Sequence, residues 1–312
     1  MMLSDRSKRR LLMSALLASL LTMGLSGCGG GSGGHEGHEG HGGGTAATKG
    51  PVTEAQPSVT PNEHAGHETG GAHSQHGDEA DSGIVMDWRF EPANPAPGEE
   101  VAIHMSVTDA SGKRVESFEL GHEKEMHLIV VRDDLSEFYH VHPLRASGSG
   151  DTFTQQMTLP SSGIYKLFAD FIPAGHAQMT AAATVKLEGN EQSQPLSPDE
   201  KLLREEQGVE VELELSSMKA GEDTELAFTL RDAVTKAELN DLEPYLGAIG
   251  HVVVIDEDLE HYLHVHPVHE QARGPVARFA TAFPEPGLYR IWGQFKRNGE
   301  TFVVPFTVRI SS

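Results

Sequence analysis

The sequence contains the same phrase twice, and this internal repeat constrains the fold more than any other feature. Residues 127–143 read HLIVVRDDLSEFYHVHP, and residues 251–267 read HVVVIDEDLEHYLHVHP. Equivalent positions lie 124 residues apart (251 − 127), and the alignment continues without a gap to Phe171 and Phe295. A repeat of this length predicts two domains of one architecture.

Each copy of the phrase predicts a β-hairpin, because two β-rich runs flank an acidic turn. If the first turn centres on Asp133 and Asp134, positions whose numbers sum to 267 face one another across the strand pair. His127 then lies opposite His140, and His142 is a diagonal neighbour on the same face. The same arithmetic groups the second set of histidines. A register shifted by one residue would disperse each set.

Three imidazoles on one face predict a transition-metal site in each domain, since histidine is the commonest side-chain metal ligand. The set suits Zn(II) or Cu(II), with one coordination position left for water, a carboxylate or a partner. The structural alternative is that buried histidines satisfy backbone carbonyls where a strand ends before a proline. The predicted ligands are His127, His140 and His142 in the first domain and His251, His264 and His266 in the second.

Other side chains near the hairpins are weaker candidates for the same chemistry. Thioether sulfur favours Cu(I), although methionine in a β-domain is more often core filler. Three further histidines near the hairpins are expected to be ordinary surface residues, and the alternative is that they supplement a metal site. The methionines are Met105, Met126 and Met179, and the histidines are His122, His261 and His269.

Residues 1–27 resemble the signal peptide of a bacterial lipoprotein. A basic segment at 6–10 precedes an apolar stretch at 11–25 that is short for a membrane span. The stretch ends in Leu-Ser-Gly-Cys, which predicts lipidation of Cys28 and attachment to the extracytoplasmic face of a cell membrane. Cys28 is the single cysteine of the chain, which excludes an intramolecular disulfide, a thiolate metal site and a cysteine nucleophile.

Residues 28–83 predict a disordered, His-rich tether, because they are rich in Gly, Ser, Thr, Glu and Pro and almost lack large apolar side chains. Such a tether would hold the folded part away from the membrane. Its histidines are expected to collect Zn, Cu or Ni weakly, and a polar spacer with unpartnered histidines is the alternative. They are His35, His38, His41, His64, His67, His73 and His76.

The remainder predicts an all-β fold of two tandem immunoglobulin-like sandwiches, at 84–189 and 208–312. Tyr165 and Tyr289 are placed like the tyrosine corner of such sandwiches. Each domain has short β-rich runs separated by Gly, Pro, Asp and Asn. They are 84–90, 101–107, 126–131, 138–142, 153–159, 164–171 and 181–187, then 209–215, 224–230, 251–255, 262–266, 276–283, 288–295 and 301–310.

The linker at 190–207 predicts the one short helix of the chain. Its Ser-Pro-Asp-Glu sequence at 197–200 is a capping box with proline at the first helical position, and the helix would run to about residue 207. Helical patterns are scarce elsewhere, which disfavours a doubly wound α/β enzyme.

The lipobox, the tandem sandwiches, the repeated phrase and the PGLYRIW strand at 286–292 resemble extracytoplasmic bacterial proteins with YtkA-like domains. The resemblance covers about 84–187 and 208–312 and leaves the tether aside. It implies the sandwich fold and an association with the handling of copper or other heavy metals. Glu125-Met126 stands where the second domain has Ile249-Gly250, so the two sites need not share one metal preference.

Motifs and charge limit the remaining function classes. No Ser-His-Asp order, phosphate loop or HExxH helix stands out, so we do not expect an enzyme. The formal net charge of −22 favours cations and disfavours nucleic acid as a partner. The sequence predicts a lipid-anchored protein that buffers or delivers copper or zinc. The alternative is a metal-free envelope scaffold or adhesion module that contacts another envelope protein and has structural histidines.

Overall fold

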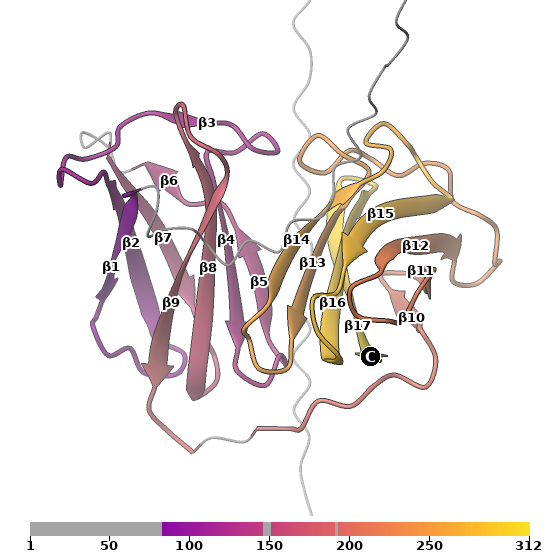
Figure 1. Cartoon of the computed structure of the whole chain (residues 1–312). Coiled ribbons are helices and arrows are strands. Elements are labelled where there is room, and N and C mark those ends of the chain that lie inside the picture. The colour runs from indigo at the N-terminus through magenta and orange to yellow at the C-terminus, as the bar shows by residue number, and fades with distance from the viewer. Residues whose placement is uncertain (1–82, 146–150, 191–192) are drawn as a thin grey trace, which may run out of the picture. The chain divides into compact units, whose positions relative to one another are not determined.

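The computed structural model describes residues 83–145, 151–190 and 193–312 (Figure 1). The described residues all belong to one compact unit. The regular secondary structure of the described residues is all β-strand. This part of the chain therefore contains no helix that is long and apolar enough to cross a membrane. The predicted signal peptide, Cys28 and the seven tether histidines lie outside the described residues.

The first sandwich consists of two antiparallel sheets (Figure 1). One sheet has the order β1-β2-β7-β6. In the other, β8 lies between β4 and β9, β5 is added beyond β4, and β3 pairs with the end of β8. The strands are β1 (Val85–Glu91), β2 (Glu100–Thr108), β3 (Phe118–Glu119), β4 (Met126–Arg132), β5 (Phe138–Val141), β6 (Leu144–Arg145), β7 (Thr152–Thr158), β8 (Gly163–Pro173) and β9 (Met179–Leu187).

The second sandwich repeats this plan along one hydrogen-bonded path, β10-β11-β12-β15-β14-β13-β16-β17. Strand β14 joins the two faces of the sandwich, because Tyr262–Val265 pair with β13 whereas His266 and Pro267 pair with β15. The strands are β10 (Leu203–Glu206), β11 (Val209–Leu215), β12 (Asp223–Asp232), β13 (His251–Asp256), β14 (Tyr262–Pro267), β15 (Val276–Ala282), β16 (Gly287–Arg297) and β17 (Glu300–Ile310).

Every predicted β-run coincides with a strand, so the all-β fold of two repeated domains is confirmed. The tyrosine corners are also confirmed. Tyr165 donates its hydroxyl hydrogen to the carbonyl oxygen of Ser161 at 3.1 Å, and Tyr289 donates to that of Glu285 at 2.8 Å. The first sandwich sets β1-β2-β7 against β9-β8-β4-β5, which is the A-B-E against G-F-C-C′ arrangement of immunoglobulin-like sandwiches.

Every residue of strands β4 and β13 is buried, so both faces of these strands are covered. A strand covered on one side only would alternate between buried and exposed residues. Inward-facing Leu128 and Val130 of β4 belong to the apolar core of their own sandwich. Outward-facing Ile129 and Val131 belong to a separate apolar cluster that also contains Val253 and residues of β14 and β16. The two sandwiches therefore pack on one another through these outer sheet faces.

The contacts of this interface repeat under the 124-residue offset. Phe138 stacks on Trp292 with ring centroids 4.7 Å apart, and Phe168 stacks on Tyr262 at 4.6 Å. Residue 262 is the equivalent of 138, and 292 is the equivalent of 168, so the two stacks are one contact with the domains exchanged. Such self-complementary packing is typical of a two-fold symmetric dimer, and here it joins two halves of one chain.

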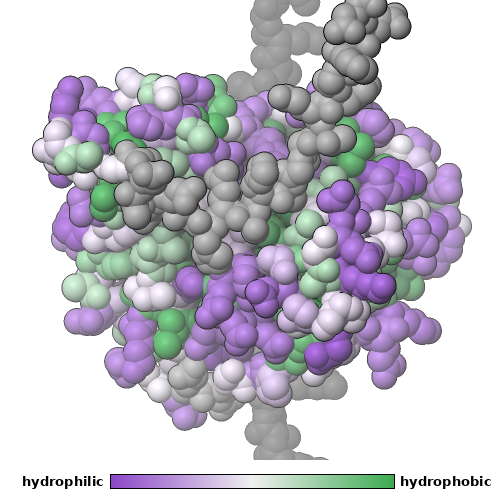
Figure 2. Space-filling view, in the orientation of Figure 1, coloured by the Kyte–Doolittle hydropathy of each residue, from purple (hydrophilic) through white to green (hydrophobic). Residues whose placement is uncertain are grey.

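Hydrophilic residues cover much of the face shown in Figure 2, and hydrophobic residues lie between them in smaller areas. The large apolar side chains that are exposed are single ones, such as Leu144 and Val234. Scattered exposure of this kind is ordinary for a folded domain. The apolar side chains that join the two sandwiches are those of the buried cluster between them.

The predicted hairpin register is wrong by two residues. Ile129 pairs with His140, so paired numbers sum to 269 instead of 267. The turn is longer than predicted because Leu135 adopts a left-handed backbone (φ 57°) and buries its side chain in the cluster between the sandwiches. Leu259 does the same in the second hairpin (φ 59°). A shift of two keeps each histidine on its predicted face, because side chains alternate with a period of two.

The short helix predicted at 197–207 is wrong. Residues 203–206 form β10 and pair with β11 across a two-residue turn at 207–208. Both turn residues have positive φ (49° and 76°), which is the geometry that joins tightly paired strands. Asp199 of the expected capping box instead accepts a hydrogen bond from the backbone nitrogen of Thr307 at 2.9 Å, so it holds the linker on β17.

The interface makes a testable contribution to stability. Phe168→Ala removes a ring that is 2 % exposed, and we expect it to lower the free energy of unfolding by about 3–5 kcal/mol. Urea denaturation followed by tryptophan fluorescence measures the change. Ile164→Ala, on the same strand but 39 % exposed, is the control and should cost less than about 0.5 kcal/mol. A loss below about 1 kcal/mol for Phe168→Ala would contradict the described packing.

Candidate metal centre

Seven histidines from both sandwiches meet in one cluster at the interface. Six of them are the predicted ligands, so the two predicted triads adjoin one another instead of lying apart in separate domains. The seventh is His122, in the tight turn before β4. Neighbouring rings have centroids 4.7–6.1 Å apart. We call the set of His122, His127, His140, His142, His251, His264 and His266 the histidine cluster.

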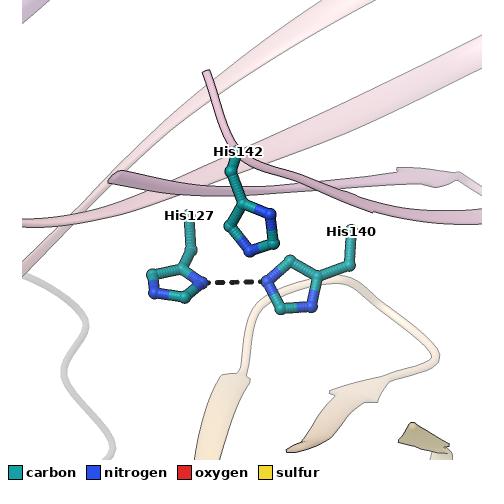
Figure 3. Close-up of side chains that lie close together, drawn as sticks. All are labelled: His127, His140 and His142. Carbon is teal, nitrogen blue, oxygen red and sulfur yellow. Dashed lines mark hydrogen bonds between the residues drawn. The ribbon is translucent and has the colours of Figure 1, made fainter. Parts of the chain in front are cut away.

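His127, His140 and His142 form the tightest group within the cluster (Figure 3). One ligand nitrogen of each ring lies within 4.8 Å of the other two. The Nδ1 atom of His127 is 3.0 Å from Nε2 of His140, and the ring of His142 points toward this pair (Figure 3). His127 is the second residue of β4, His140 lies in β5, and His142 directly follows β5. The register of this hairpin therefore sets the spacing of the three side chains.

A backbone acceptor fixes the tautomer of His127. Its Nε2 donates to the carbonyl oxygen of Gly121 at 2.8 Å, and a neutral imidazole has one N–H, so Nδ1 carries a lone pair. This Nδ1 atom faces Nε2 of His140 at hydrogen-bond distance (Figure 3), and Nδ1 of His140 is 3.0 Å from Oε1 of Gln294. Nε2 of His142 is buried and has no hydrogen-bond partner. A shared cation would satisfy all three nitrogens.

The second triad is arranged differently. Nδ1 of His251 is 3.3 Å from Nε2 of His264, which is the equivalent of the His127–His140 contact. His266 does not complete this group. Its Nδ1 instead lies 3.0 Å from Nε2 of His122, which belongs to the first sandwich. The repeated phrase therefore produces one compact triad in the first sandwich. In the second, His266 contacts His122 of the first sandwich instead of forming a compact triad with His251 and His264.

Asp170 and Gln294 are equivalent residues (294 − 170 = 124) that cross the interface in opposite directions. Gln294 of the second sandwich supports His140, and Asp170 of the first supports His264, whose Nδ1 is 2.8 Å from Oδ2 of Asp170. Tyr262 also donates to this carboxylate at 2.6 Å. An acceptor behind a histidine fixes its tautomer, and a carboxylate makes the ring more basic. The two triads therefore differ in electrostatics.

Burial favours the neutral form of six of the seven histidines by lowering the pKa of their rings. Desolvation, with repulsion from neighbouring imidazoles, lowers the pKa of His122 to about 3 and the pKa of His127 and His142 to about 4. It also lowers the pKa of His140 and of His251. Neutral imidazole is the form that binds metal ions, and it is the form that the interface stabilises at neutral pH.

Asp170 keeps its charge although it is 3 % exposed. Burial alone would raise the pKa of its carboxyl, but the hydrogen bond from His264 lowers it, with further hydrogen bonds from Thr180 and Tyr262. A buried charge of this kind is stable only when it is paired and fully hydrogen-bonded. The cluster therefore contains one fixed negative charge, and it stands behind the second triad.

The weaker candidates fall into two groups. Met105, Met126 and Met179 all lie in the apolar core of the first sandwich, as methionines usually do. His261 bonds to Asp256 in the second hairpin turn, and His269 is exposed. The expectation that His122 is an ordinary surface residue is wrong, because its ring packs against three members of the second triad.

The sequence analysis did not identify Asp170 and Gln294, which contact the far side of two predicted ligands. Asp170 and Gln294 pair directly with His127 and His251 on the neighbouring strand, and both are buried. The signal was a charged residue inside the otherwise apolar run Leu-Phe-Ala-Asp-Phe that ends at residue 171. A lone carboxylate in a buried strand predicts a polar partner nearby.

Fold and site together define a protein of two tandem β-sandwiches that share a histidine cluster. The chain belongs to the family of the domain of unknown function DUF8832, whose model matches residues 79–189 and 204–312. Each match contains one copy of the repeated phrase. The resemblance to YtkA-like domains stays a prediction. A search of curated proteins finds no match.

Solved structures give distant similarities only. The FdeC adhesin of Escherichia coli is 13 % identical, with a TM-score of 0.25, over 74 % of this chain and 65 % of that chain. A titin fragment, A168–A169, is 12 % identical, with a TM-score of 0.18, over 73 % of this chain and 97 % of that chain. Salmonella alpha-2-macroglobulin is 11 % identical, with a TM-score of 0.23, over 77 % of this chain and 15 % of that chain. This chain spans less than two thirds of the adhesin chain, and scores of this size support no inference about function.

The buried histidines predict a pH-dependent stability in the presence of a chelator. His122, His127 and His142 titrate near pH 6.5 when unfolded and near pH 3 to 4 when folded, so between these values the unfolded state binds more protons. Their contribution is complete above pH 6.5 and is lost as the pH falls toward 4. Urea denaturation at pH 7.5 and pH 5.0 should show a loss of more than about 2 kcal/mol. An equal free energy of unfolding at both values would contradict the buried, neutral cluster.

Proposed function

We propose that this protein is a lipid-anchored, extracytoplasmic metal-binding protein that holds copper or zinc at the first triad of the histidine cluster. The observation that carries the proposal is that ligand nitrogens of His127, His140 and His142 all lie within 4.8 Å of one another. Two imidazole nitrogens at 2.0–2.1 Å from one tetrahedral ion would be roughly 3.3 Å apart. The nitrogens of His127 and His140 are already 3.0 Å apart, and His142 offers the third nitrogen.

Three ligands suit reversible binding. A structural zinc site usually closes its coordination with four protein ligands, whereas three leave a position for water or for an incoming ligand. Exchange at that position is what a buffering or delivery protein needs. The formal net charge of −22 raises the local concentration of cations, and the tether histidines would gather ions loosely before they reach the cluster.

The metal-free alternative is supported by one observation. Two hydrogen bonds of the cluster, from His140 to Gln294 and from His264 to Asp170, join the two sandwiches directly. In this alternative the histidines only specify how the domains dock, and the protein serves as an envelope scaffold or adhesion module.

Zinc titration of the full chain tests the first triad. The seven tether histidines are replaced by asparagine so that binding reports on the folded part. His142→Gln removes a ligand nitrogen that has no other partner, and we expect zinc affinity at this site to fall by more than about 100-fold, since even outer-shell partners are worth 10- to 100-fold. Isothermal titration calorimetry measures the affinity.

His269→Gln is the matched control for this titration, because His269 is exposed and lies outside the cluster. It should bind zinc as the parent does. If the parent takes up neither zinc nor copper, the metal-free scaffold is the better account. The same holds if His142→Gln binds both metals with unchanged affinity.

Lipid anchoring has its own test. The proposed anchor is the thiol of Cys28, which is the only thiol of the chain. In a bacterial host, we expect the protein to incorporate radiolabelled palmitate and to partition into the detergent phase of Triton X-114. Cys28→Ser should abolish both, while Ser26→Ala should leave both unchanged. Palmitate incorporation by Cys28→Ser would contradict the proposed anchor.

A further inference from the structure

A small cavity lies between the sandwiches, next to the second triad. Its volume is about 10 Å³, which is the size of about one water molecule. Side chains of both halves of the chain line it, among them His122, His127 and Asp170 of the first sandwich and His264 of the second. Three imidazoles and the carboxylate of Asp170 thus lie in its wall, beside apolar side chains such as Phe171 and Ile172. Imidazole and carboxylate are groups that bind divalent cations.

A hydrogen bond to Asp170 fixes the orientation of the His264 ring. A carboxylate only accepts hydrogen bonds, so His264 donates from Nδ1 to Asp170 at 2.8 Å, and its Nε2 carries the lone pair on the other side of the ring. A carboxylate behind a histidine is the usual support of a metal ligand. Nδ1 of His251 lies 3.3 Å from that Nε2 atom, which is about the separation of two nitrogen ligands on one tetrahedral ion.

His122 brings a ligand from the other sandwich to this place. Its ring centroid is 4.7 Å from that of His251 and 4.8 Å from that of His266, and its Nε2 atom is 3.0 Å from Nδ1 of His266. The equivalent residue of the second sandwich is Leu246, which has a similar left-handed backbone (φ 54° against 45°). The turn is therefore common to both domains, whereas the imidazole is specific to the first.

We propose that His122, His251, His264 and His266 bind a second transition-metal ion across the domain interface, with Asp170 as the outer carboxylate of His264. Four imidazoles form a closed ligand set, which is typical of structural sites, whereas the first triad keeps one position open. The two close nitrogen pairs, at 3.0 and 3.3 Å, would reach one ion by rotation of the rings, because among the described residues only the nitrogens of the first triad already lie within 4.8 Å of one another. Because its ligands come from both sandwiches, the ion fastens the domains together.

This inference shares the ligand chemistry of the proposed function but none of its ligand residues, so the two are separable. The full chain with the seven tether histidines replaced by asparagine is titrated with zinc, and the bound metal is counted after gel filtration. We expect two zinc ions in this parent, one in His122→Asn and one in His142→Gln. Asparagine is used at residue 122 because it tolerates a left-handed backbone.

Asp170→Asn tests the outer carboxylate without removing a ligand. It keeps the size of the side chain, and we expect the affinity for the second zinc ion to fall 10- to 100-fold while the first is unchanged. Zinc should raise the melting temperature of the parent and of His142→Gln by more than it raises that of His122→Asn, because the second ion fastens the domains. His269→Asn is the control and should bind two ions.

The outcomes separate the two sites. One zinc ion in the parent, kept by His122→Asn and lost in His142→Gln, overturns the second site and leaves the proposed function standing. One zinc ion lost in His122→Asn and kept by His142→Gln overturns the first triad and supports the second site. No zinc in any protein overturns both.

Discussion

The structure depends on the burial of both faces of β4 and β13. In each sandwich one face of this strand supports the internal core, and the other face packs against the opposite domain through Ile129, Val131 and Val253. Without the second contact the histidines at the start of these strands would face water and would titrate near pH 6.5. The interface removes them from water and keeps them neutral, which is the form of imidazole whose lone pairs bind metal ions.

The interface is nearly symmetric, and its departures from symmetry separate two kinds of site. Gln294 supports His140 with a neutral amide, whereas Asp170 supports His264 with a charge. His122 stands where the second sandwich has Leu246, so only one of the two turns offers an imidazole to the neighbouring domain. A compact triad with an open position and a group of four histidines with a carboxylate behind it therefore arise around one repeated phrase. This difference fits the proposed division between an exchangeable and a structural ion.

The fold could be predicted from the sequence because the repeat, the β-rich runs and the tyrosine corners are local signals. The shared face of each triad was also predictable, since it depends on the parity of the register, and the turn containing Leu135 shifted the register by an even number. The helix at 197–207 failed because a hairpin turn with two left-handed residues competed with a capping box. The meeting of both triads could not be derived, because it depends on how two folded surfaces dock. The uninterrupted apolar runs after His127 and His251 did carry a signal of it, since only strands covered on both faces lack polar alternation.

Anomalous diffraction at the zinc absorption edge, on crystals of the zinc-loaded protein, tests the central claim most directly. The account predicts an anomalous peak bounded by the rings of His127, His140 and His142, with nitrogen ligands at about 2.0–2.1 Å. Density for well-ordered side chains at this position, with no anomalous signal in the histidine cluster and zinc held only by surface carboxylates, would contradict it.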